Sequence, residues 1–325
     1  MPRKYWKQVL SLMILSPLLA EVLSSNVSLG AFLNPPNLFL LITLGYGIPV
    51  LIIRELAVRR QLGLQGLLLL GVAYGIYNEG FIAKTFLLAC NVPLEQFNGY
   101  GMLLGIGVPW AILISSWHAL FSVLLPILYV YHFFPSRIQE PWIGKRTSWV
   151  LFALILATGS VNFLSLSNNG QKGSPLQLVV LVAAGSVLSV LALRASRPEV
   201  KPQSEYSGKY LWGGALWFAI SIAIPIGIAG FRAPVLLYLG YALLLTALLG
   251  FVLSRRPEVS RDALLLFGLG AQICTAIGVL VTFLLAFDPQ RILSSVLLLV
   301  LFFHLVFSIR SSAHPPPAPS EKQQR

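Results

Sequence analysis

The sequence contains little charge and few cysteines. Charged residues make up 10% of its 325 residues, and the chain has two cysteines. A soluble chain needs about a quarter of its residues charged to solvate its surface, and a disulfide-stabilised scaffold is dense in cysteine. The low charge therefore excludes a soluble enzyme and a disordered chain, and the cysteine count excludes a disulfide scaffold.

Long apolar stretches take the place of the missing charge. Hydrophobic residues make up 56% of the chain, and its mean hydropathy is +0.79. Stretches of about 20 apolar residues are long enough to cross a bilayer as helices. The sequence predicts an all-α, polytopic integral membrane helix bundle with about ten transmembrane helices, at 8–26, 38–58, 63–84, 110–131, 147–167, 176–193, 210–230, 235–254, 263–287 and 292–309.

The distribution of positive charge predicts the orientation of these helices. If the amino terminus is cytoplasmic, the segments on the inner side hold 18 Lys and Arg residues, whereas the outer loops hold only Lys172, Arg232 and Arg291. Lys and Arg collect in cytoplasmic loops of membrane proteins. We therefore expect both termini to be cytoplasmic. The same rule explains the net charge of +12 without a nucleic-acid partner, so the expected partners are the lipid bilayer and a small-molecule or ion substrate.

Ionisable residues divide the chain into a charged part and a plain part. Each such residue costs at least about 2.5–3.5 kcal/mol at the centre of a membrane helix, so it marks a candidate site. The last six predicted helices contain no Asp, Glu, Lys or Arg. We expect residues 1–135 to hold the charged cluster, 136–310 to act as scaffold, and the Pro-rich segment 311–325 to be a disordered cytoplasmic tail. The first four predicted helices contain Glu21, Arg54, Glu55, Glu79, Lys84 and His118.

Depth and helical spacing predict one site in the outer half of the membrane. The rise of 1.5 Å per residue places groups from the first, third and fourth predicted helices in the same leaflet. On the third, Gly71, Gly75 and Glu79 lie on one stripe, so the carboxylate faces a neighbouring helix. On the fourth, Tyr129 and His132 extend the polar stripe of the site residues. We expect a polar cavity with these substrate- or ion-binding residues: Glu21, Asn78, Glu79, Lys84, Ser115, His118 and Ser122.

Other polar and aromatic residues have simpler interpretations. Arg54 and Arg59 are long enough to reach the inner headgroups, and Glu55 is spaced to pair with Arg59 at i, i+4. Cys90 and Cys274 are far apart and lack metal-ligand spacing, so no metal site or cofactor is expected. Five tryptophans near predicted helix ends are interpreted as anchors at the membrane interface: Trp6, Trp110, Trp142, Trp149 and Trp212. Segment 101–109, which is rich in glycine, could form an outer loop, an interfacial turn or a re-entrant piece.

Several strings carry a resemblance to known families. The strings Pro17-Leu-Leu-Ala-Glu21, Leu51-Ile-Ile-Arg-Glu55, Ala73-Tyr-Gly-Ile-Tyr-Asn-Glu-Gly80 and Trp117-His-Ala-Leu-Phe-Ser-Val123 resemble a group of uncharacterised prokaryotic multi-pass membrane proteins. This resemblance covers about the first 135 residues and implies a prokaryotic plasma membrane, but it supplies no activity.

A weaker similarity is to the CAAX-protease and bacteriocin-processing membrane family. Asn78-Glu79 and Ile114-xxx-His118 stand where that family has Glu-Glu-xxx-Arg and Phe-xxx-His, while Ala83 occupies the arginine position and no His-xxx-Asn motif follows. The similarity implies catalytic roles for two residues: Glu79 would activate water and His118 would stabilise the oxyanion.

Three functions remain open from the sequence. A small secondary transporter is favoured by ten helices in about 300 residues and by Gly/Pro-interrupted segments at 45–49 and 224–230, since such pairs mark a midplane site. An intramembrane hydrolase is favoured by the confinement of Glu79 and His118 to the first four helices. The third candidate is an assembly or scaffold subunit, in which an ion pair of Glu79 with His118 or Lys84 only fixes the register of the helices.

Overall fold

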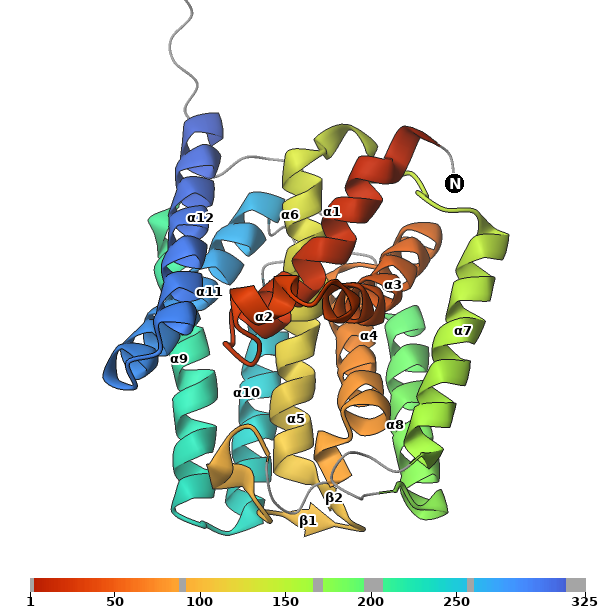
Figure 1. Cartoon of the computed structure of the whole chain (residues 1–325), viewed down its shortest axis with the longest axis vertical. Helices are drawn as coiled ribbons and strands as arrows, with labels where there is room; N and C mark the ends of the chain where they lie inside the picture. The colour runs from red at the N-terminus through yellow and green to blue at the C-terminus, as the bar shows by residue number, and fades with distance from the viewer. Residues whose placement is uncertain (1–2, 88–91, 166–171, 196–206, 256–259, 314–325) are drawn as a thin grey trace, which may run out of the picture.

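The computed structural model describes residues 3–87, 92–165, 172–195, 207–255 and 260–313, and helices make up most of them (Figure 1). All ten predicted spans coincide with helical segments. The α-helices are α1 (Trp6–Pro17), α2 (Leu29–Leu33), α3 (Pro36–Arg60), α4 (Leu64–Tyr77), α5 (Val108–Trp117), α6 (Leu125–Phe133), α7 (Lys145–Leu164), α8 (Pro175–Arg194), α9 (Gly208–Gly230), α10 (Val235–Arg255), α11 (Arg261–Leu285) and α12 (Pro289–Ala313).

Three of the helical segments change from α-helical to π-helical hydrogen bonding. α1 continues into the π-helix η2 (Leu18–Val22), and α4 continues into η3 (Asn78–Ile82). A third π-helix, η6 (His118–Leu124), joins α5 to α6. A π turn bonds residue i to i+5 and is rare; it is frequent at functional sites.

Seven helices of the described residues are long and apolar enough to cross a membrane. They lie at Phe39–Arg60, Val108–Phe133, Lys145–Leu164, Pro175–Arg194, Gly208–Gly230, Arg261–Leu285 and Pro289–Ser311. The first residues of α1 and the last residues of α12 lie at the same end of the molecule, the top of Figure 1. The chain is thus a helical, multi-pass membrane protein, while ten crossings and cytoplasmic termini stay predictions.

The sequence left three alternatives open for segment 101–109: an outer loop, an interfacial turn or a re-entrant piece. In the structure it forms a small β-hairpin followed by the start of α5. β1 (Met102–Leu103) pairs antiparallel with β2 (Ile106–Gly107). The hairpin lies at the bottom of Figure 1, at the end opposite the two chain ends described above. Within the described ranges the secondary structure is therefore helical apart from this hairpin, and α5 begins directly after it.

α4 lies near the centre of the bundle and packs closely on the segment α5–η6. A Cβ added to Gly75 would lie 2.5 Å from the Cα of Ser115, and one added to Gly71 would lie 2.6 Å from the Cα of Ala119. Only glycine permits so close an approach of two helix backbones. The stripe of small residues on this helix therefore faces the neighbouring helix, as its spacing predicts, and brings the residues that follow it against η6.

The expected scaffold part and the expected charged part share one core. Leu125 of α6 packs against Gly268 of α11, and α8 packs along α4. α2 contacts α12: the backbone N–H of Leu29 donates to Ser294 Oγ at 3.0 Å, and the hydroxyl of Ser28 donates to Gln290 Oε1 at 3.2 Å. Of the predicted disordered tail, residues 311–313 belong to α12, and 314–325 lie outside the described residues.

Candidate functional site

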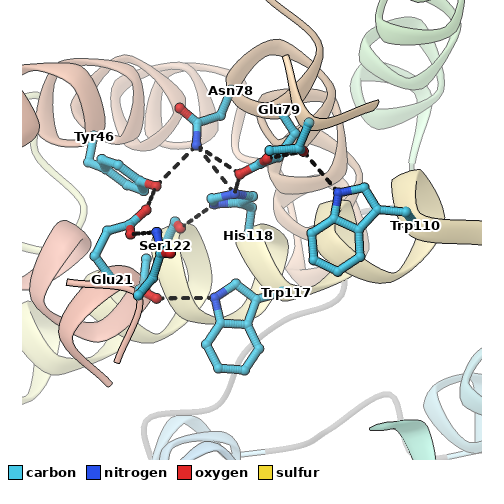
Figure 2. A network of polar contacts seen from close by, with 11 residues as sticks. Glu21, Tyr46, Asn78, Glu79, Trp110, Trp117, His118 and Ser122 are labelled. Atoms are coloured by element: carbon cyan, nitrogen blue, oxygen red, sulfur yellow. Dashed lines mark hydrogen bonds and ion pairs between the residues drawn. The ribbon is translucent and has the colours of Figure 1, made fainter. Parts of the chain in front are cut away.

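The three π-helical segments meet and bring the buried polar residues together (Figure 2). Glu21 lies on η2, Asn78 and Glu79 lie on η3, and His118 and Ser122 lie on η6. The fourth helix of the site is α3. Each π turn locally changes which side of the helix a residue faces, so the polar side chains leave the regular apolar faces and point toward one another.

A contact between Glu79 and His118 forms the centre of the site. His118 Nε2 lies 2.8 Å from Glu79 Oε1, and His118 Nδ1 lies 2.7 Å from Ser122 Oγ. His118 is 2% exposed and Glu79 is 7% exposed, so water does not compete for these bonds. Both ring nitrogens of the histidine are engaged, which fixes the orientation of the imidazole.

The 2.8 Å contact between Glu79 and His118 requires one hydrogen between Oε1 and Nε2. Asn78 Nδ2 lies 3.3 Å from His118 Nε2 and 3.1 Å from Tyr46 Oη. If Nε2 carries a hydrogen, it donates to the Glu79 carboxylate and cannot accept from Asn78. If Nε2 carries none, the Glu79 carboxyl must carry the proton for their contact to be a hydrogen bond. Both arrangements place one hydrogen between Oε1 and Nε2, so the contact is a hydrogen bond in either case.

Glu21 forms a second acidic position on the other side of Asn78. The Tyr46 hydroxyl donates to Glu21 Oε1 and accepts from Asn78, and Asn26 Nδ2 donates to Glu21 Oε2 at 2.5 Å. The indole N–H of Trp117 donates to the carbonyl of Ala20 at 3.3 Å and so ties η2 to the end of α5. Asn78 thus connects the two carboxylates, through Tyr46 to Glu21 and directly to Glu79, but an amide does not readily pass a proton between them.

Two residues extend the network toward the hairpin end of the molecule. The Thr85 hydroxyl donates to Glu79 Oε2, and the indole N–H of Trp110 donates to Thr85 Oγ1 at 2.9 Å. The interpretation of Trp110 as an interface anchor is therefore wrong, because its ring is 3% exposed and belongs to the site. The two oxygens of Glu79 consequently face different groups, His118 and Thr85.

Lys84 and Ser115 differ from the other predicted site residues. Lys84 is buried, but Nζ donates to the carbonyl of Ser165 at 2.7 Å, at the end of α7, rather than to Glu79. A cation is favourable there because the last carbonyls of a helix carry partial negative charge. Ser115 is buried beside α4, and its hydroxyl has no hydrogen-bond partner within the described residues.

The inner pair of Arg54 and Glu55 does not extend to the headgroups. Arg54 is fully buried: Nη1 donates to Glu55 Oε1 at 2.7 Å, Nη2 donates to the carbonyl of Ile138 at 2.8 Å, and its guanidinium carbon lies 3.5 Å from the centroid of the Trp142 ring. The predicted reach of Arg54 to the headgroups is therefore wrong, as is the placement of Trp142 at the interface. The expected pair of Glu55 with Arg59 is present at 3.3 Å.

This inner cluster fastens the connection between α6 and α7. Glu55 Oε1 accepts from the backbone N–H of Trp142 at 2.7 Å, and Arg59 donates to the carbonyl of Ile143. Arg54 and Tyr46 lie on the same helix, eight residues and about 12 Å apart at 1.5 Å per residue, with Pro49 between them. α3 therefore connects the inner cluster to the outer site.

Sequence reasoning did not identify Tyr46, Tyr74 or Thr85. Tyr46 lies inside the Gly/Pro-interrupted segment 45–49, so that segment was a usable signal. Tyr74 lies in one of the resemblance strings, and its ring centroid lies 5.7 Å from that of His118. Thr85 follows the third predicted span directly and had no signal of its own.

The donor set of the site suits protons and cations rather than a transition metal. Among the described residues, no three His, Cys, Asp or Glu side chains gather at one place. The site instead offers two carboxylates, one imidazole, two amides and several hydroxyls. Such a set can exchange protons, bind a cation, or orient a water molecule for hydrolysis.

Comparison with known proteins gives a family and no activity. A model described as an uncharacterised membrane protein family matches residues 10–315. No curated protein and no solved structure matches the chain. The match spans both the charged part and the expected scaffold part, so it extends well beyond the strings of the first 135 residues. The chain therefore belongs to this uncharacterised family of membrane proteins.

Proposed function

We propose that this protein is a small secondary transporter that couples the movement of a small solute to the binding and release of a proton or cation. One observation carries the proposal: two carboxylates on different helices, Glu21 and Glu79, are connected through Tyr46 and Asn78 where three helices are π-helical. Interrupted helices around buried ionisable groups are a recurring construction of transporter sites.

The proton held between Glu79 and His118 supplies the coupling. A solute that interacts with either residue changes how strongly the pair holds that proton, and binding linkage makes the effect reciprocal. The buried cluster around Arg54 lies on the same helix as Tyr46, so a movement of α3 would affect both the cluster and the site.

Thiol accessibility from the two sides of the membrane tests the proposal. In a chain with Cys90 and Cys274 replaced, Ser115→Cys and Thr43→Cys place thiols at buried positions three residues before His118 and Tyr46, without removing a hydrogen bond of the network. A membrane-impermeant maleimide is then applied from each side of oriented vesicles. We expect both positions to react from both sides, whereas Ser116→Cys, on the exposed face of α5, serves as a control for lipid-facing thiols and reacts from neither.

Two other outcomes would overturn the transporter. Reaction from the outer side alone would indicate a pocket closed at its base. Absence of reaction from either side would indicate a buried ion pair that only fixes the bundle.

The contact of Glu79 with His118 favours an intramembrane hydrolase as a second candidate. A glutamate that activates water beside a histidine that stabilises an oxyanion needs these two groups at hydrogen-bond distance, and they are 2.8 Å apart. Labelling from the outer side alone, together with Glu79-dependent cleavage of prenylated or other membrane-embedded peptides, would support this function.

A further inference from the structure

The outer site contains two carboxylates and, among the described residues, no lysine or arginine paired with them. Glu21 accepts hydrogen bonds from Tyr46 and Asn26. Glu79 accepts one from Thr85 and contacts His118. The two buried cations nearest in sequence are bound elsewhere, Arg54 by Glu55 and Lys84 by a backbone carbonyl. A site with this charge attracts a cation.

Aromatic rings surround the same acidic groups. The ring centroids of Tyr46, Tyr74 and His118 form a triangle with sides of 5.7, 5.8 and 6.1 Å. Both tyrosines are buried, and their rings meet edge to face at an interplanar angle of 74°. A desolvated tyrosine ring attracts an organic ammonium ion more than a hydrated metal ion.

The hydroxyl of Tyr74 is the specific feature of the site. Tyr74 is 4% exposed, so water does not reach this hydroxyl freely. Its oxygen nevertheless makes no hydrogen bond within the described residues. Buried hydroxyls almost always have partners, so one without a partner in a polar site points to a ligand group. The Tyr74 oxygen has lone pairs that can accept an N–H, as can the carboxylates of Glu21 and Glu79.

We propose that the outer site binds an organic ammonium ion that carries at least one N–H. The two carboxylates supply the opposite charge, the rings of Tyr46 and Tyr74 contact the apolar substituents next to the nitrogen, and the Tyr74 oxygen accepts the N–H. This inference rests on the proposed transport function, of which it names the substrate class.

Equilibrium binding to the purified full-length chain in detergent tests the inference. The probes are n-butylammonium, tetramethylammonium as a cation of similar size without N–H, and n-butanol as a neutral analogue, each at constant ionic strength. Quenching of tryptophan fluorescence reports occupancy, since Trp110 belongs to the site. We expect saturable binding of n-butylammonium, at least tenfold weaker binding of tetramethylammonium, and no saturable binding of n-butanol.

Variants assign the binding to the proposed residues. Glu79→Gln and Glu21→Gln should each weaken n-butylammonium binding at least tenfold, and Tyr74→Phe should weaken it about fivefold while it keeps the ring. Tyr77→Phe is the matched control, because the Tyr77 hydroxyl donates to the carbonyl of Ile155 at 2.8 Å, on α7 and outside the network. Each variant is first required to match the wild type in melting temperature and in size-exclusion profile.

Different results separate this inference from the transport proposal. Equal binding of n-butanol and n-butylammonium, equal binding of tetramethylammonium, or binding unaffected by both Gln variants would overturn the inference. Saturable binding of n-butylammonium without its uptake into proteoliposomes would overturn transport and leave the inference standing. Two-sided thiol accessibility without any binding of ammonium ions would overturn the inference and leave the transport proposal standing.

Discussion

The hydroxyl of Ser16 on α1 donates a hydrogen bond of 2.7 Å to the backbone carbonyl of Ser122 on η6. Pro126 lies four residues after Ser122 and has no N–H to offer to that carbonyl. The side chain of one helix thus fills the position that proline leaves open on another. Ser122 also holds His118, so the bond connects α1 to the centre of the site.

Ser16→Ala should destabilise the protein and shift His118. An unpaired buried carbonyl costs about 1–3 kcal/mol, so we expect a lower melting temperature in detergent. Ser116→Ala is the control, because Ser116 is exposed and bonds only to a carbonyl of its own helix. Equal melting temperatures of the two variants would show that the bond from Ser16 contributes nothing.

Gly75→Ala should separate α4 from α5. The added Cβ would lie 2.5 Å from the Cα of Ser115, which is backbone and cannot yield without moving the helix. Overpacking of this kind costs about 1–3 kcal/mol, measured as a lower unfolding temperature. Gly185→Ala on α8 is the matched control, because no atom lies within 4 Å of its added Cβ. A stable Gly75→Ala variant would contradict the close approach of the two helices.

Glu79→Gln should leave the fold nearly intact and abolish activity. Glutamine has the same shape and keeps hydrogen-bonding groups for Thr85 and His118, but it cannot hold the charge or the proton. We expect a free energy of unfolding within about 1 kcal/mol of wild type and no coupled solute uptake in proteoliposomes. Glu95→Gln, at an exposed position of the 3-10 helix Glu95–Phe97, is the control. If Glu79→Gln fails to accumulate in the membrane while Glu95→Gln does, the ion pair is structural.

Arg54→Met should release the connection between α6 and α7. It leaves the buried Glu55 carboxylate without its closest cation, and breaking a buried pair costs about 3–5 kcal/mol. We expect a lower melting temperature and faster proteolysis between residues 134 and 144, and Arg60→Met, at an exposed position, should show neither. Addition of Glu55→Gln to Arg54→Met should restore part of the stability, because it removes the uncompensated charge. No recovery in the double variant would argue against the pair as the source of the effect.

The helical framework could be predicted from the sequence because it depends on local properties. Apolar length and the residues that end helices depend on neighbours in the chain, and all ten predicted spans coincide with helices. The facing of Gly71 and Gly75 was also predictable, since the regular helix α4 runs through those two positions, and Glu79 follows directly on η3. The contact between Glu79 and His118 then follows from shared depth and facing.

The π turns could not be predicted, and they changed the site. The polar stripe of the fourth predicted helix was drawn with one period from Ser115 to His132. In the structure η6 interrupts that period, and the Tyr129 hydroxyl donates to Gln272 of α11 instead of pointing into the site. A π turn has no residue signature in a single sequence, so helical spacing beyond it becomes unreliable.

The partners of buried charged residues could not be predicted either where they lie in connections between helices or at helix ends. Depth alone suggested that Arg54 reaches the headgroups, but Trp142 and the carbonyl of Ile138 lie in the connection that folds over it. The burial of Lys84 against the carbonyl of Ser165 has the same origin. Buried charges were located correctly, whereas their partners required the three-dimensional arrangement.

The contact of α2 with α12 has a consequence for biosynthesis. Ser28 and Leu29 lie near the beginning of the chain, and their partners Gln290 and Ser294 lie near its end. A ribosome makes the chain from its amino terminus. The hydrogen bonds of α2 with α12 can therefore form only after residues 290–294 have been synthesised. The segment between η2 and α3 therefore reaches its final arrangement last, only after the final helix of the described residues has entered the membrane.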